Sequence, residues 1–303
     1  MLGNISRSIG FFFGSLFLVS LLVFFLINLT PGDIREIHNL SPQTSALLHL
    51  DKPLWLQYLI WAGNCLRLDF GISMVDGTPV ATLLWNYAPS TLLLSFGSLS
   101  LSLLMAIPIG VYRGMRPGVL IEKLSSLVVY SVSSVPTFVL GYIVLAIAFG
   151  FFHAYITTPP EGPFNASRWI AYYFLPVLVL SVGNGSLGEF VRFISLEVES
   201  INSGMFMKSA RARGVSLWPH FLRSMLLPIF NIAVTNIAVL LGGLVVVERI
   251  FNFHGLGWLS WEATLKRDFT VIMGITLSMA VVVRFLMLIN EFLAVWIDPR
   301  LRR

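Results

Sequence analysis

Six apolar segments, each long enough to cross a bilayer, constrain this chain more than any other feature. They cover residues 9–29, 90–112, 124–152, 170–188, 225–247 and 271–296. A spanning helix needs about 20 apolar residues, because the hydrocarbon core is about 30 Å thick and a helix rises about 1.5 Å per residue. Charged residues make up only 12% of the 303 residues, about half of what soluble domains carry. The sequence therefore predicts an all-α membrane protein with six transmembrane helices.

The first apolar segment is expected to be a retained helix and not a cleaved signal. Its 21 residues follow Arg7 and match the length of a spanning helix. The next residues, Thr30 to Asp33, do not form the small-residue cleavage site of a secretory signal. Other segments contain helix breakers, which membrane helices tolerate because neighbouring helices satisfy the freed backbone groups. These breakers are Pro108, Pro136, Pro176 and the pair Gly242-Gly243.

The distribution of Lys and Arg orients the predicted helices. Twelve cations fall in about 62 residues on one side, and seven fall in about 99 residues on the other. The cation-rich side comprises residues 1–8, 113–123, 189–225 and 298–303. Cytoplasmic loops of membrane proteins are enriched in Lys and Arg, so both termini and residues 189–225 are predicted to be cytoplasmic. The net charge of +5 thus reflects topology and does not indicate nucleic-acid binding.

Three regions follow from this topology. They are the N-terminal cytoplasmic tip with the first span (1–29), a periplasmic or extracellular region (30–89), and a core of five spans (90–303) that includes the cytoplasmic loop 189–225. In the middle region, apolar and aromatic residues recur at helical spacing at Trp55, Tyr58, Leu59 and Ala62. This spacing predicts an amphipathic helix that lies in the membrane interface.

The sequence lacks the motifs of common catalytic sites. None of the four lysines follows a glycine, so no phosphate-binding P-loop is present. No HExxH or GxSxG motif occurs, and the single cysteine, Cys65, excludes an internal disulfide. A GxGxxG match at Gly183, Gly185 and Gly188 lies in a predicted membrane segment, which favours close helix packing over a dinucleotide site. We therefore expect no enzyme activity, no bound cofactor and no metal site in this chain.

The interval from Asn202 to Pro228 is polar, cationic and punctuated by glycines, and it predicts two short helices. Gly204 separates the first helix from the preceding one, with Asn202 or Ser203 as its cap, and Gly214 ends it. The second helix is expected to start at a Ser216 cap, with Pro219 in its first turn.

The first short helix fits two interpretations. Met207, Ala210 and Arg211 share one face, and small residues such as Ser209 and Ala212 would let another protein surface come close. The alternative is a solvated linker whose cations lie on anionic lipid headgroups. The spacing favours a helix that docks on a protein.

Several motifs occur in an order that resembles a known transporter family. They are TPGD (30–33), LDKPLWLQYLIW (50–61), LDFGIS (68–73), PVATLLWNYAPSTLLLS (79–95), IPIGVYRG (107–114), SVPTFVLG (134–141), KSARARG (208–214), HFLRSMLLP (220–228), LLGGLVVVERIFNFHGLGWL (240–259), RDF (267–269) and DPRLR (298–302). Together they resemble ABC-importer permeases, specifically the first membrane subunit of the dipeptide, oligopeptide and nickel importer family. The resemblance runs nearly end to end.

This resemblance implies the architecture of a type I ABC importer permease, a multi-pass protein of the bacterial plasma (inner) membrane. It implies as partners a second, related permease subunit, two cytoplasmic ABC ATPases that hold ATP and Mg²⁺, and an external solute-binding protein. In this family a coupling helix fits a groove on an ATPase, and its cations can pair with an acidic rim. That role would fall here to Met205, Phe206, Lys208, Ser209, Ala210, Arg211, Ala212, Arg213 and Gly214.

Two further groups of residues are candidates for function. Arg284 lies near the middle of the sixth apolar segment, where a cation costs about 2.5–3.5 kcal/mol on insertion scales. Glu291 lies on the same helical face, and a structural pair of Arg284 with Glu291 or with a neighbouring subunit is favoured over a role in the translocation path. The second group is Glu248, Arg249, Gly255 and Gly257. The resemblance suggests that this group forms an outer gate or a binding-protein contact, and the alternative is an interfacial ion pair of little energy.

The resemblance therefore implies a permease subunit of an ATP-driven importer of di- or oligopeptides. The same architecture would also serve nickel chelates or another small solute. An ion-coupled secondary transporter fits less well, because it would normally have more spans, often in repeats, and would need no basic docking helix. A membrane-anchored scaffold would not need spans interrupted by Pro and Gly.

Overall fold

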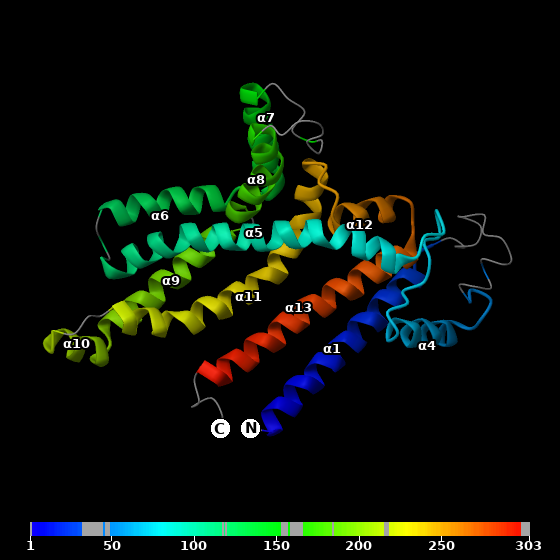
Figure 1. Cartoon of the computed structure of the whole chain (residues 1–303), viewed down its shortest axis with the longest axis horizontal. Coiled ribbons are helices and arrows are strands. Elements are labelled where there is room, and N and C mark those ends of the chain that lie inside the picture. Colours follow the sequence, from blue (N-terminus) through cyan, green and yellow to red (C-terminus); the bar gives the residue numbers. More distant parts are fainter. Residues whose placement is uncertain are drawn as a thin grey trace. The chain divides into compact units, whose positions relative to one another are not determined.

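The computed structural model is built from helices (Figure 1). It describes residues 2–31, 45, 49–116, 118, 120–152, 157, 166–183, 185–214 and 218–297. The helices are α1 (Leu2–Asn28), α4 (Leu54–Cys65), α5 (Val80–Met115), α6 (Leu120–Ser133), α7 (Thr137–Phe152), α8 (Ala166–Val182), α9 (Ser186–Ser203), α10 (Met205–Ala212), α11 (Trp218–Ile250), α12 (Leu256–Leu265) and α13 (Phe269–Ile297). Extended pairing in these residues is limited to one bridge between Ile72 and Pro79, so the predicted all-α class is confirmed.

Three helices are long and apolar enough to cross a membrane without a break. These spans are Arg7–Asn28 in α1, Val80–Met115 in α5 and Phe269–Val295 in α13. Three further spans arise only if each of three bent helix pairs crosses as one unit. The bends are 96° between α6 and α7, 55° between α8 and α9, and 52° within α11. The described residues thus contain three to six spans, and the predicted six is the upper end of this range.

Local chemistry explains where two of these bends occur. Pro136 lies between α6 and α7, where its missing N–H cannot continue the helix ladder. Gly185 precedes α9 with φ +78, a left-handed conformation that glycine adopts without steric cost. By contrast, Pro108 and Pro176 lie inside the uninterrupted helices α5 and α8. α5 also begins at Val80, well before the predicted start near residue 90.

The chain divides into two compact units. Unit 1 comprises residues 1–90, 254–289 and 302–303, and unit 2 comprises residues 91–253 and 290–301. The helices α5 and α13 therefore contribute residues to both units. Residues 254–289 group with the N-terminal residues in unit 1.

Unit 1 holds α4 against α1 through an aromatic cluster. Tyr58 is buried, packs edge-on against Phe24 and shares a hydrogen bond of 3.0 Å with the Ser20 hydroxyl. A helix is present where the sequence predicts the amphipathic one, but its predicted apolar face is divided. Tyr58 faces α1, whereas Trp55 and Leu59 are exposed.

Unit 2 is organised around α9 and α11. α11 packs against α7, α8 and α9, and α9 also contacts α6, α8 and α10. The buried face of α9 includes Phe190, Val191, Ile194 and Val198, which have no exposed surface. Because this face is closed off from solvent, α9 provides a fixed support for the short helix that follows it.

Candidate functional site

The candidate coupling segment begins where α9 ends. Gly204 follows Ser203 with an extended backbone (φ −63, ψ 149), and its N–H donates to the carbonyl of Ile201. Its own carbonyl accepts the N–H of Lys208 at 3.2 Å, which starts the next helix. The Ser203 hydroxyl donates back to the Ser200 carbonyl. The predicted break at Gly204 is therefore present, and it separates α10 from α9.

The short helix α10 is amphipathic. Met207 is 4% exposed, and α10 rests on α9. Met205, which is 78% exposed, shares the outward side of the helix with Lys208, Ser209 and Ala212. These four residues follow the spacing i, i+3, i+4 and i+7, so they form one continuous exposed stripe. We call them the α10 stripe.

The end of α10 is fixed by backbone and side-chain contacts. Both the N–H and the Nε of Arg213 donate to the Ser209 carbonyl, at 3.2 and 3.3 Å. Gly214 follows with φ +66, the left-handed conformation that ends helices. Both features agree with the predicted stop at Gly214.

Some predicted features of this segment differ from the structure or lie outside the described residues. The predicted second short helix is not separate, because Trp218 and Pro219 form the first turn of the long helix α11. The Ser216 cap lies outside the described residues. Phe206, Ala210 and Arg211 belong to α10, but their side chains lie outside the described set.

The end of α5 supports α9 through two glycines. Gly110 and Gly114 are spaced as in the GxxxG motif that lets membrane helices approach closely. A Cβ at Gly110 would lie 2.7 Å from Cγ2 of Ile194, and one at Gly114 would lie 2.5 Å from the Ser195 carbonyl oxygen. Neither position has room for a methyl group. α5 and α9 are thus in direct backbone contact next to the segment that carries α10.

Comparison with known proteins identifies the family. A model of the family described as binding-protein-dependent transport system inner membrane component matches residues 106–303, which include α9, Gly204 and α10. The chain belongs to this family. It is therefore a membrane permease subunit of a transport system and not an enzyme.

Relatives of similar length agree with this assignment. The oligopeptide transport system permease protein AppB of Bacillus subtilis is 32% identical over 299 residues, which cover 93% of this chain and 94% of that protein. The nickel import system permease protein NikB of Staphylococcus aureus is 30% identical over 305 residues, which cover 95% of this chain and 88% of that protein. The permease is accordingly a multi-pass component of the bacterial inner membrane.

The glycines of the GxGxxG match have packing roles in the permease. A Cβ at Gly183 would lie 2.9 Å from the Thr137 hydroxyl, and one at Gly188 would lie 3.2 Å from Cβ of Ser133. The Gly188 N–H also donates to the Ser133 hydroxyl at 3.1 Å. With Gly185 in the left-handed conformation before α9, all three glycines serve the junction between helices.

The structure gives Arg284 a partner that sequence reasoning did not foresee. Its Nη2 donates to the carbonyl of Phe11 in α1 at 3.0 Å, and its Nη1 lies 3.6 Å from the Met287 sulfur. Glu291 is exposed near the end of α13. Arg284 thus joins α13 to the backbone of α1 within unit 1.

The candidate gate residues are divided between the two units. In unit 2, Glu248 has no exposed surface and accepts a hydrogen bond of 2.7 Å from the Thr91 hydroxyl, whereas Arg249 is exposed. In unit 1, Gly255 caps α12 in an extended conformation and Gly257 is buried in its first turn. The full burial of Glu248 distinguishes it from a solvated interfacial ion pair.

Asp268 has a role that sequence reasoning missed. It is buried, and its Oδ1 accepts the N–H of Val271 at 3.3 Å, which caps α13. Its Oδ2 accepts the Ser73 hydroxyl at 2.5 Å, and its Oδ1 accepts the Met74 N–H at 3.2 Å. An Asp directly before an apolar helix is a known cap signal, so the RDF motif could have indicated the cap. The link to residues 73–74, which are distant in sequence, could not be seen there.

The turn that Asp268 holds carries a second acid. The Thr78 hydroxyl donates to Asp76 Oδ1, and this contact is the main reason why the pKa of Asp76 is below its usual value. Ser73 also lowers that pKa. In the residues that the structure describes, no cluster of three or more His, Cys, Asp or Glu side chains is arranged to hold a metal ion.

Proposed function

We propose that this permease forms half of a heterodimeric membrane pore in an ATP-driven importer. A related permease subunit completes the pore, two cytoplasmic ABC ATPases bind below it, and an external solute-binding protein delivers the solute. ATP and Mg²⁺ are held by the ATPases, and this chain binds no cofactor. The family description, a component of binding-protein-dependent transport, supports these partners.

The α10 stripe is the observation that carries this proposal. An exposed Met205 at the tip of a helix is a common feature of protein-binding surfaces, because its flexible side chain adapts to a partner. Lys208 adds a positive charge that suits an acidic groove rim, while Ser209 and Ala212 are small enough for close contact. Phe206, Ala210, Arg211, Arg213 and Gly214 complete the proposed coupling segment.

The packing of α9 explains how such a contact would act on the pore. Force applied to α10 passes to α9 through the buried Met207 and then to α5 through Gly110 and Gly114. Closely packed helices move as rigid bodies because their interfaces have little free volume. Closure of the ATPases would therefore displace the membrane helices and not merely bend a loop.

We assign the remaining candidates to the same transport cycle. Glu248 and Arg249, with Gly255 and Gly257, belong to an outer gate or a binding-protein contact. Arg284 and Glu291 are candidates for the translocation path, although the bond from Arg284 to Phe11 also supports a structural role. In Arg284→Ala, lost transport with intact assembly would indicate the path, and failed assembly would indicate the structural role.

A charge reversal and a steric block in the α10 stripe test the coupling role. Lys208→Glu and Ser209→Trp should each reduce ATP-dependent uptake into proteoliposomes by about tenfold, the factor that 1.4 kcal/mol of lost contact energy gives. The ATPases should retain hydrolysis that no longer responds to solute. Arg116→Glu is the matched control, because Arg116 is an exposed cation outside α10.

Two outcomes would contradict the proposal. One is normal uptake by both α10 variants. The other is uptake driven by an ion gradient in the absence of ATPases, which would assign the chain to the secondary transporters.

The proposed substrates are di- or oligopeptides, with nickel chelates or another small solute as the alternative. The oligopeptide permease of B. subtilis and the nickel permease of S. aureus resemble this chain about equally, so identity alone does not choose between them. Mass spectrometry of the solute that co-purifies with the binding protein would decide. A peptide supports the main proposal, and a nickel complex supports the alternative.

A further inference from the structure

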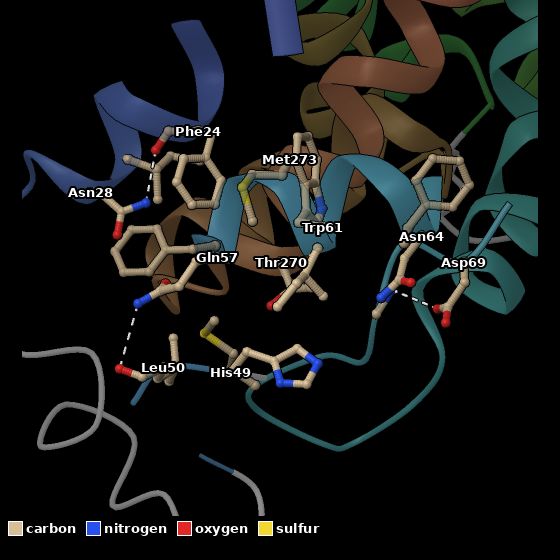
Figure 2. Close-up of a pocket in the computed structure, with 16 residues that line it drawn as sticks. Phe24, Asn28, His49, Leu50, Gln57, Trp61, Asn64, Asp69, Thr270 and Met273 are labelled. Atoms are coloured by element: carbon tan, nitrogen blue, oxygen red, sulfur yellow. Dashed lines mark hydrogen bonds between the residues drawn. The ribbon is translucent and has the colours of Figure 1, made fainter. Parts of the chain in front are cut away.

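A cavity of about 90 Å³ lies in unit 1 at the ends of two spans (Figure 2). It is lined by the end of α1, by α4, by residues 49–50 and 69–74 and by the start of α13. Phe24, Ile60 and Met273 contribute apolar walls. At about 30 Å³ per water-sized group, the cavity has room for roughly three such groups.

Two polar groups that line this cavity lack a partner within the described part of the chain. They are the indole Nε1 of Trp61 and the hydroxyl of Thr270, and both atoms are buried. Thr270 is 3% exposed. In Figure 2 its hydroxyl oxygen points into the space that Gln57, His49 and Trp61 surround. Burying a polar group without a hydrogen bond costs about 1–3 kcal/mol, so these two groups indicate a missing ligand.

Two other polar side chains at the cavity have hydrogen-bond partners. The Gln57 amide donates to the Lys52 carbonyl at 2.8 Å, and the Asn28 amide donates to the Phe24 carbonyl at 2.9 Å. The two groups without a partner can both donate a hydrogen bond. The indole N–H is a donor only, and the Thr hydroxyl can act as a donor. The ligand must bring an acceptor oxygen on an otherwise apolar body.

The position of the cavity along the spans indicates the source of that oxygen. The α1 span of 22 residues is about 33 Å long, which matches the hydrocarbon core, and the cavity lies at its Asn28 end. Phe269, the first residue of the α13 span, also lines the cavity. The cavity is thus at the depth of the membrane interface, where the ester carbonyls of phospholipids lie.

The surroundings suit the rest of such a lipid. Trp55 and Leu59 on α4 and Phe25 and Leu26 on α1 are exposed apolar side chains. Trp is typical of the interface, and the apolar side of α1 offers a surface along which an acyl chain can lie. The volume admits only the carbonyl and its neighbouring atoms, so both acyl chains would remain outside the cavity.

We propose that this cavity binds one ester carbonyl of a phospholipid, which accepts hydrogen bonds from Trp61 and Thr270. The bound lipid closes the space between α1, α4 and the start of α13. This site is independent of the coupling role of α10.

A comparison of ester and ether lipids tests the site. The permease is purified in detergent and exchanged into micelles that contain either a diacyl phosphatidylethanolamine or its diether analogue, which has no carbonyl. Native mass spectrometry then counts the lipids that remain bound. The wild-type chain should retain one ester lipid about tenfold more strongly than the ether lipid, which corresponds to the two hydrogen bonds.

Two conservative substitutions identify the cavity as the site. Trp61→Phe keeps an aromatic ring and Thr270→Val keeps the shape of the side chain, but both remove the donor. Together they should abolish the preference for the ester lipid. Trp55→Phe on the exposed side of α4 is the matched control and should keep it. The comparison of lipids on the wild-type chain remains decisive even if a variant folds poorly.

Three results would overturn the proposal. Equal retention of ester and ether lipids by the wild-type chain would mean that only water fills the cavity. An unchanged ester preference in the double variant would place the lipid elsewhere. Displacement of the bound lipid from the wild-type chain, but not from the double variant, by millimolar trialanine would assign the site to a peptide carbonyl.

Discussion

At the scale of single residues, Cys65 shows how its surroundings change the chemistry of a side chain. Burial, and then the charge of Asp69, raise its pKa from 9.0 to about 12. Because the thiolate is the reactive form, at pH 8 its population should be about a thousand times smaller than for an ordinary thiol. We expect slow alkylation by iodoacetamide at pH 8 in the folded permease and faster alkylation as the pH rises towards 12.

The unfolded chain is the control for this prediction. In denaturant the thiol loses its burial and should react at the ordinary rate. If Cys65 reacts equally fast in the folded and unfolded chains, its surroundings in the fold do not raise the pKa of the thiol.

Single residues also show which features of the candidate site can be predicted from the sequence and which cannot. The stop at Gly214 and the break at Gly204 were predictable, because glycine has local conformational roles at helix ends. The burial of Met207, the bond from Arg284 to Phe11 and the contact between Asp268 and Ser73 depend on distant segments. Periodicity within one helix cannot identify such partners.

At the scale of elements, the contact between α5 and α9 makes a sharp prediction. Gly114→Ala places a Cβ 2.5 Å from a backbone oxygen, so one helix must shift. Overpacking of this kind costs about 1–3 kcal/mol. We expect a lower Tm in detergent and reduced coupling between ATP hydrolysis and uptake.

Gly14→Ala in α1 is the matched control, because nothing lies within 4 Å of a Cβ there. It should leave the Tm unchanged or slightly raised, since Ala favours helix over Gly. A Gly114→Ala protein as stable as the wild type would show that α5 and α9 are not in backbone contact.

The spans illustrate how far hydropathy predicts elements. Each of the six apolar segments is mainly helical where the structure describes it, with breaks at residues 134–136 and at Gly183 and Gly185. This helicity follows from the need to satisfy backbone groups in lipid. The 96° bend between α6 and α7 was not foreseen, although Pro136 was recognised as a breaker. A composition window registers apolarity but not direction, so a bent pair and a straight span look alike.

At the scale of the whole molecule, the charge pattern predicts the sidedness of the chain. In a Cys65→Ser background, a membrane-impermeant maleimide added to intact spheroplasts should label Lys266→Cys but not Lys208→Cys. Breaking the membrane should expose Lys208→Cys. Both Lys266 and Lys208 are exposed, so sidedness alone separates them.

Labelling of Lys208→Cys from outside would reverse the topology and remove α10 from the reach of cytoplasmic ATPases. It would leave the family assignment intact. The coupling role therefore depends on the predicted topology. Membership of the family does not, because it rests on the match over residues 106–303.

The tie between Asp268 and residues 73–74 has a practical consequence. Hydrogen bonds from Ser73 and Met74 to Asp268 hold the stretch from Ser73 to Thr78 at the first turn of α13, so this stretch should move with that helix. Any displacement of the start of α13 must carry this stretch along. A spectroscopic label attached at Asp76, which lies outside the spans, would therefore report from the aqueous side on the movement of a helix in the bilayer.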